Sequence, residues 1–209
     1  MQRHLVVMAK LPCAGRVKTR LARQIGVAEA LRVYRTILNR TLRDLSADPR
    51  WQIWIAVSPD TAIHSPVWPK VNLMGQGSGG LGQRMQRVFD VLPVGPVVII
   101  GSDIPGIRRA DIADAFAALG SNDAVFGPAG DGGYWLVGQR RHPTVLPMFE
   151  DVRWSSAHAL ADTLANLNSA EFVRQIDDLD TAADYRKWRK GLGSVLNKSL
   201  PFCAGKFAG

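Results

Sequence analysis

An acidic residue directly follows the most apolar run of the chain, in residues 97–106 (VVIIGSDIPG). The four apolar residues that open this segment predict a strand buried on both faces. Gly101, Ser102 and Asp103 come next, before a Pro-Gly break, so a carboxylate lies where the strand ends. Ligands bind at that edge of open α/β sheets, and a carboxylate oxygen there suits Mg²⁺ or Mn²⁺. The alternative is that Asp103 only caps the turn.

Three cationic residues follow an earlier apolar run, within residues 9–22 (AKLPCAGRVKTRLA). Gly15 indicates a turn, and Arg16, Lys18 and Arg20 then occupy alternate positions, which places them on one side of an extended loop. If a helix begins early instead, Arg16 and Arg20 still share one of its faces at i, i+4. A loop of this kind after the first strand holds nucleotide phosphates in many α/β folds. This loop carries neither GxGxxG nor GxxxxGK(S/T), so those two nucleotide motifs are excluded here. An ordinary basic surface loop is the alternative.

A second candidate carboxylate stands among glycines in residues 127–138 (GPAGDGGYWLVG). Asp131 precedes two glycines between two apolar segments, which is a strong signal for a hairpin turn. Beside Asp103, which ends a neighbouring predicted strand, Asp131 could instead meet a metal ion bound to phosphate oxygens.

More acidic residues follow the last predicted strand, at 177–180. Thr181 and Asp184 have the spacing of a capping box, which gives part of this cluster a structural explanation. Asp178 or Asp180 is nevertheless a candidate for a further metal ligand.

The glycine-rich segment at 75–85 (GQGSGGLGQRM) precedes an apolar stripe of helical period. Backbone without side chains can approach a ligand closely, and Gln76, Ser78 and Arg84 are the polar groups available. We therefore interpret this segment as a loop that contacts the substrate or a base, with a flexible surface turn as the alternative.

The predicted strands and helices that position these residues alternate along the chain. The pattern predicts strands at 5–8, 51–57, 97–100, 124–126, 134–137 and 172–176, and helices at 28–45, from 81, at 108–119 and at 160–167, with 58–72 irregular. This alternation indicates a single α/β domain with a mixed, mostly parallel sheet. We expect the domain to span residues 1–190 and residues 191–209 to form a loosely ordered tail.

Composition narrows the class of protein further. The chain has 209 residues, is 46% hydrophobic and has a formal net charge of +8. It lacks a run of about 18 apolar residues, so we expect a soluble, cytoplasmic protein with no membrane partner. Cys13 and Cys203 have neither disulfide-framework nor metal-ligand spacing and are expected to be free thiols. The positive charge calls for an anionic partner or a solvated basic surface.

The segments AKLPCAGRVKTRLA, GQGSGGLGQRM, GSDIPG and GPAGDGGYWLVG together resemble the bacterial radical-SAM/selenodomain-associated transferases. These have the glycosyltransferase A-type, Rossmann-like fold and are related to molybdenum-cofactor nucleotidyltransferases and phospholactate guanylyltransferase. WSSAHAL and DLDTAADY match later motifs more loosely. The resemblance implies a three-layer nucleotide-diphospho-sugar transferase fold. It also implies a nucleotide-binding set, namely Ala9, Lys10, Gly15, Arg16, Lys18, Arg20, Gly82 and Ser102.

The resemblance further implies that Asp103 is the metal-binding acid, that Asp131 lies beside the acceptor and that Lys18 takes part in catalysis. We therefore expect a transferase dependent on Mg²⁺ or Mn²⁺ that uses a nucleotide-diphospho-sugar and an unidentified small-molecule acceptor. Transfer of a nucleotidyl group from a nucleoside triphosphate to a small phosphorylated acceptor is the alternative reaction. A basic nucleic-acid-binding protein and a transferase fold that binds without turnover are the alternatives of other classes.

Overall fold

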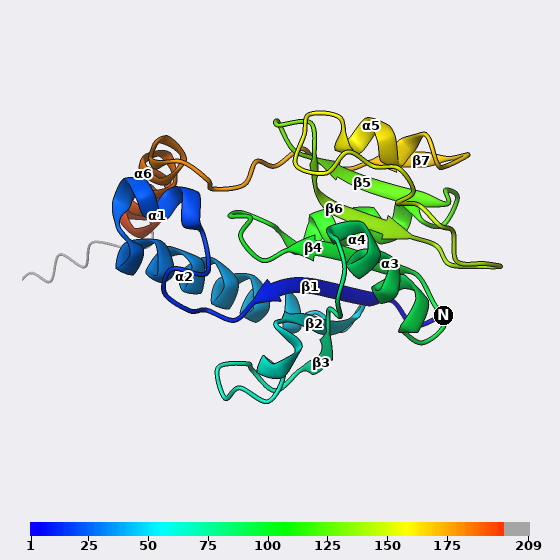
Figure 1. Cartoon of the computed structure of the whole chain (residues 1–209), viewed down its shortest axis with the longest axis horizontal. Helices are drawn as coiled ribbons and strands as arrows, with labels where there is room; N and C mark the ends of the chain where they lie inside the picture. The colour runs from blue at the N-terminus through cyan, green and yellow to red at the C-terminus, as the bar shows by residue number, and fades with distance from the viewer. Residues whose placement is uncertain (199–209) are drawn as a thin grey trace, which may run out of the picture.

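The computed structural model describes residues 1–198, with side chains up to Gly191, and is built on one seven-stranded sheet (Figure 1). The strands are β1 (His4–Lys10), β2 (Gln52–Ser58), β3 (Asn72–Gly75), β4 (Val97–Gly101), β5 (Ala124–Pro128), β6 (Tyr134–Gln139) and β7 (Ala170–Phe172). The helices are α1 (Thr19–Ile25), α2 (Val27–Ser46), α3 (Leu81–Val91), α4 (Arg109–Ala118), α5 (Ala159–Leu164) and α6 (Ala182–Lys198), with a short 3₁₀ turn, η1, at Asp60–Ala62.

The strands lie in the order β3-β2-β1-β4-β6-β5-β7. Neighbouring strands pair in parallel except at β6, which pairs antiparallel with both β4 and β5. The connection from β5 to β6 covers only residues 129–133, and so short a connection requires a hairpin. The sequence-based prediction of an α/β fold with a mixed, mostly parallel sheet is confirmed.

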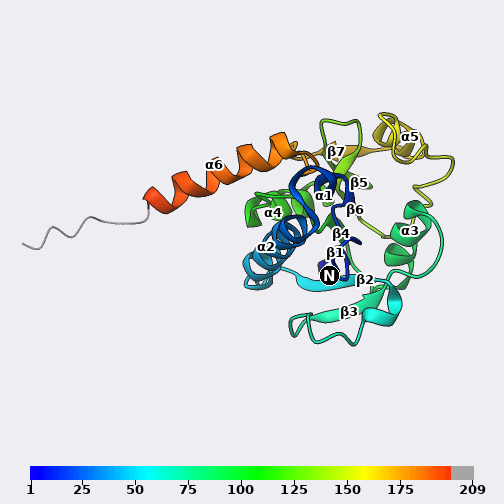
Figure 2. The same ribbon diagram turned by 60° about the vertical axis from the view of Figure 1, so that its left-hand side comes forward.

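Helices cover both faces of the sheet: α2 and α4 lie on one side, and α3 and α5 lie on the other (Figure 2). Because each helix carries an apolar stripe, two cores form, one around Leu42 and Ile112 and the other around Phe89 and Phe126. A third apolar cluster joins α1, α2 and α6 at one end of the molecule.

Three local predictions differ from the structure. The final strand, β7, covers residues 170–172 and not the expected 172–176, because its pairing with β5 ends at Phe126 and Phe172. Residues 173–176 keep only isolated backbone hydrogen bonds to the sheet. Strand β3 begins at Asn72, at the end of the segment predicted to be irregular, and α1 begins inside the basic loop.

At the C-terminal end, α6 continues from Ala182 to Lys198, and the rest of the predicted tail, residues 199–209, lies outside the described residues. Over the described chain, none of the helices has the length and apolar character needed to cross a membrane.

Candidate active site

The predicted chemistry gathers at one edge of the sheet. Since every strand except β6 runs in the same direction, the loops that follow these strands meet at one edge of the sheet. A cavity of about 630 Å³ opens there. Its polar wall includes Lys10, Lys18, Ser102, Asp103, Asp131 and Asp178.

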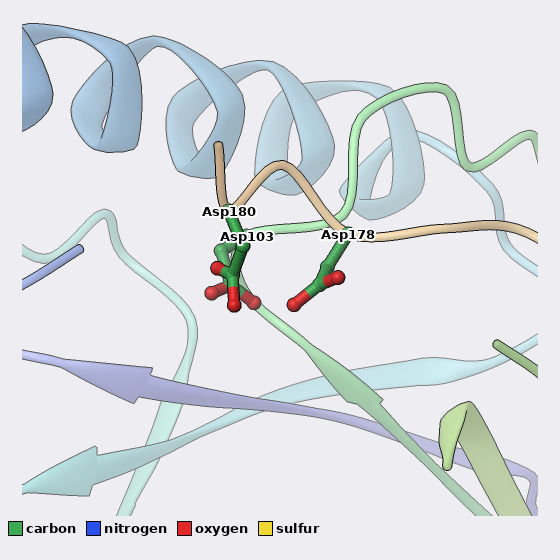
Figure 3. Close-up of side chains that lie close together, drawn as sticks. All are labelled: Asp103, Asp178 and Asp180. Carbon is green, nitrogen blue, oxygen red and sulfur yellow. The ribbon is translucent and has the colours of Figure 1, made fainter. Parts of the chain in front are cut away.

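Three carboxylates converge beside this cavity, and we call Asp103, Asp178 and Asp180 the acidic trio (Figure 3). Asp103 follows β4, whereas the other two lie on the segment between β7 and α6. One oxygen from each of the three lies within 4.8 Å of the others. Oxygen donors at this spacing suit a hard divalent cation such as Mg²⁺ or Mn²⁺, so the residues present fit the predicted metal.

Lys18 supplies positive charge to the acidic trio. Its Nζ lies 2.8 Å from Asp103 Oδ2 and 3.0 Å from Asp180 Oδ1, and its side chain is only 2% exposed. Burial alone would lower the pKa of this ammonium, but the charges of Asp103 and Asp180 outweigh burial and raise its pKa. Lys18 therefore stays charged.

Asp178 is the member of the acidic trio that forms no direct ion pair within residues 1–191. Burial, together with the neighbouring Asp180 carboxylate, raises the pKa of Asp178 to about 6, although Lys18 acts in the opposite direction. Lys18 and the exposed Arg20 together face three carboxylates, which still leaves an excess of negative charge, the electrostatic condition for binding a cation.

The hydroxyl of Tyr34 ties helix α2 to the site. It donates to the carbonyl of Lys10, accepts from the backbone N–H of Lys10 and contacts Ser102 Oγ, all at 3.0 Å. Tyr34 is 3% exposed. Tyr34 therefore fixes both the end of β1 and Ser102, the residue before Asp103. The sequence pattern indicates only that Tyr34 belongs to the apolar stripe of a helix.

The glycine-rich loop is held by side chains that sequence reasoning did not single out. The Asp60 carboxylate accepts from the backbone N–H of Gly77 at 3.0 Å, and Arg87 donates to the carbonyls of Gln76 and Ser78 at 2.7 and 3.2 Å. Gln76 is itself buried and lines the cavity. The loop is thus anchored at several points, which disfavours the alternative of a flexible surface turn.

The structure brings two of the three predicted phosphate-binding cations, Lys18 and Arg20, to Asp180 and places Arg16 elsewhere. Arg16 lines a smaller cavity of about 230 Å³ with Lys10 and Cys13, while the Arg20 side chain is 76% exposed and lies 3.5 Å from Asp180. Because α1 starts at Thr19, the alternation expected of an extended loop ends at Lys18. Of the other predicted positions in this region, Ala9 is buried in β1 and Gly15 lies in the exposed turn with φ 73°.

Gly82 is a packing position. It is buried in α3, and a Cβ there would lie 2.8 Å from the Trp154 ring and 3.0 Å from Phe149. The cavity is lined instead by its neighbours Gly79 and Gly80. A role for Gly82 facing the base or a second substrate is therefore not supported by its position.

Asp131 lies in the β5–β6 turn, where its Oδ1 accepts from the backbone N–H of Gly133 at 2.9 Å. The predicted hairpin is thus present, and the same residue also lines the cavity. Asp131 does not belong to the acidic trio, whose second and third members are Asp178 and Asp180.

Comparison with solved structures places the fold among nucleotide-diphospho-sugar transferases. A candidate nucleotide-diphospho-sugar transferase from Desulfovibrio desulfuricans G20 is 27% identical, with a TM-score of 0.81 over 99% of this chain and 92% of that one. The 4-diphosphocytidyl-2C-methyl-D-erythritol synthase of Anaerococcus prevotii shares the fold at 12% identity, with a TM-score of 0.58 over 92% and 98% of the two chains. Glucosyl-3-phosphoglycerate synthase of Mycobacterium tuberculosis, solved with Mn²⁺, uridine diphosphate and phosphoglyceric acid, shares it at 10% identity, with a TM-score of 0.54 over 99% and 81%.

The family itself follows from the sequence. Residues 41–156 match the family described as an uncharacterized protein conserved in bacteria (DUF2064), and the chain belongs to that family. No curated protein matches the sequence.

Proposed function

We propose that this protein is a transferase, dependent on Mg²⁺ or Mn²⁺, that binds a nucleotide-diphospho-sugar and transfers its sugar to a small-molecule acceptor. The observation that carries the proposal is the acidic trio with its buried lysine at the wall of a 630 Å³ cavity, at the ligand-binding edge of the sheet. The 27% identical structure that matches along nearly the whole chain supports the same class.

The residues of the cavity fall into a metal-binding group and a phosphate-binding group. Asp103, Asp178 and Asp180 would hold the cation, which when bound would neutralise charge on the phosphate oxygens and on the leaving group. Lys10 and Lys18 place ammonium groups where the phosphates would lie, and charge-assisted hydrogen bonds from them would orient the nucleotide.

Asp131 lies on the hairpin side of the cavity. We propose that its carboxylate orients the acceptor hydroxyl and accepts its proton as the new bond forms, a role that needs a carboxylate within hydrogen-bond reach of the acceptor. No covalent enzyme intermediate is required, because the acceptor attacks the nucleotide sugar directly.

Ligand-dependent thermal unfolding tests the proposal. A ligand at 100 times its Kd stabilises a protein by about 2.7 kcal/mol, which for a chain of this size raises Tm by roughly 5–10 °C. We expect such a shift from a nucleotide or nucleotide sugar with Mn²⁺, and its loss in Asp103→Asn. Asp114→Asn, which neutralises an exposed carboxylate on α4, is the matched control and should behave like wild type. If no nucleotide shifts wild type and Asp103→Asn behaves identically, the proposal is wrong.

Product analysis separates the two transferase reactions. Release of nucleoside diphosphate from a nucleotide sugar indicates glycosyl transfer, whereas pyrophosphate from a labelled nucleoside triphosphate indicates nucleotidyl transfer. Salt-sensitive binding to generic DNA that survives Asp103→Asn would instead favour a nucleic-acid-binding protein.

A further inference from the structure

We infer that Lys18 acts as a built-in cation that holds the acidic trio before substrate arrives, so that the protein takes up its metal together with the nucleotide and binds the free ion weakly. This inference rests on the proposed function. It concerns the order in which the metal and the nucleotide bind. A general role for Lys18 in binding phosphates does not specify that order.

The backbone commits Lys18 to this position. Lys18 has φ 47° and ψ 45°, the left-handed conformation that residues other than glycine rarely adopt. It directly precedes α1, whose packing against α2 and α6 fixes where the chain enters the helix. Strained residues of this kind persist where the surrounding structure determines them, and they concentrate at ligand sites.

The ammonium of Lys18 lies against carboxylates that a metal would need. It contacts Asp103 and Asp180 directly, two of the three carboxylates in the acidic trio. A divalent ion among these carboxylates would be repelled by the ammonium, and moving the ammonium away would leave a buried cation without those anionic partners. Free Mg²⁺ or Mn²⁺ should therefore bind weakly.

A nucleotide removes this obstacle. Lys18 lines the cavity together with Lys10, so phosphate oxygens entering the cavity would give the displaced ammonium new anionic partners. The same phosphates would add oxygen ligands to the metal. Metal and nucleotide should then raise each other's affinity, and by the same factor in both directions.

Titration with Mn²⁺ alone, followed by the electron paramagnetic resonance signal of the free ion, tests this coupling without any assay of activity. Lys18→Met should bind Mn²⁺ about tenfold more tightly than wild type, in the usual range of coupling between sites. Lys10→Met is the matched comparison, since it removes an equal charge from the same cavity wall, and no ion pair involves Lys10 within residues 1–191. We expect Lys10→Met to raise the Mn²⁺ affinity far less than Lys18→Met does, because only Lys18 contacts the carboxylates directly.

A second variant and a second readout guard against misfolding. Lys18→Gln keeps a hydrogen-bond donor beside Asp103 and should also bind free Mn²⁺ more tightly than wild type. In thermal unfolding, Mn²⁺ should raise the Tm of either Lys18 variant more than that of wild type.

The inference is overturned if both Lys18 variants bind Mn²⁺ no more tightly than wild type, or if Lys10→Met gives the same gain. That result leaves the proposed function standing as long as Asp103→Asn still abolishes Mn²⁺ binding. If Asp103→Asn binds Mn²⁺ as wild type does, the metal site of the proposed function is wrong as well.

Discussion

Removing the Tyr34 hydroxyl should weaken both the fold and the site, because this group joins helix α2 to the ends of two strands. Tyr34→Phe leaves the backbone N–H of Lys10 without its partner and Ser102 without a contact at 3.0 Å. An unsatisfied buried polar group costs about 1–3 kcal/mol, so we expect a loss near 2 kcal/mol in the free energy of unfolding. For a chain of this length that corresponds to a fall in Tm of roughly 4–8 °C.

Urea denaturation provides the measurement, and Tyr185→Phe is the matched control. The Tyr185 hydroxyl donates to the Glu29 carboxylate, which keeps its bonds to Arg32 when that hydroxyl is removed. The control should therefore lose less than about 1 kcal/mol. Burial raises the pKa of Tyr34 to about 12, so the hydroxyl stays protonated and the effect of Tyr34→Phe should be constant between pH 6 and 9. Equal losses from the two substitutions, or a Tyr34→Phe effect that varies with pH, would refute the reasoning.

Three further perturbations probe the scaffold. Gly82→Ala places a Cβ 2.8 Å from an indole ring and should cost about 1–3 kcal/mol in urea denaturation, whereas Gly80→Ala meets nothing within 4 Å and should cost far less; equal costs would contradict the packing role. Burial and then a nearby arginine lower the pKa of His4, so the unfolded state binds more protons and stability should fall as pH drops below about 6.5. His4→Gln should flatten that pH dependence, and an unchanged slope would exclude His4 as its source. Leu179→Ala and Leu45→Ala should each cost about 2–5 kcal/mol, but only Leu179→Ala should also weaken Mn²⁺ binding, as measured by titration at a temperature where both variants are folded.

The fold could be predicted because each main helix and strand has a clear local pattern of apolar residues in the sequence. Leu31, Tyr34, Leu38 and Leu42 recur at helical spacing and form α2, and the apolar run before Asp103 forms β4. Strand β3 could not be predicted, since its four residues, NLMG, show no alternation of apolar and polar side chains and all four are half-buried. The early start of helix α1 stayed an open alternative, since Leu21 is the one fully buried residue of its seven and the apolar pattern is weak.

The site could be predicted only in part. Asp103 and Asp131 each end or follow a strand, so sheet topology alone brings their loops to one edge. Whether Arg16, Lys18 and Arg20 act together depends on where α1 begins, and no periodicity in the loop reveals that position. The roles of these residues in binding and catalysis stay predictions.

The acidic trio depends on packing that lies away from the sheet. Leu179, between Asp178 and Asp180, is 1% exposed and belongs to the apolar cluster that joins α1, α2 and α6. Burying Leu179 there leaves its two acidic neighbours half-buried beside Asp103. The same cluster includes Leu21 of α1 and so fixes the start of the helix that Lys18 precedes. One apolar cluster therefore positions both the carboxylates of residues 178 and 180 and the ammonium of Lys18. The resulting contact joins Lys18 to Asp180, 162 positions apart, and no local sequence pattern contains it.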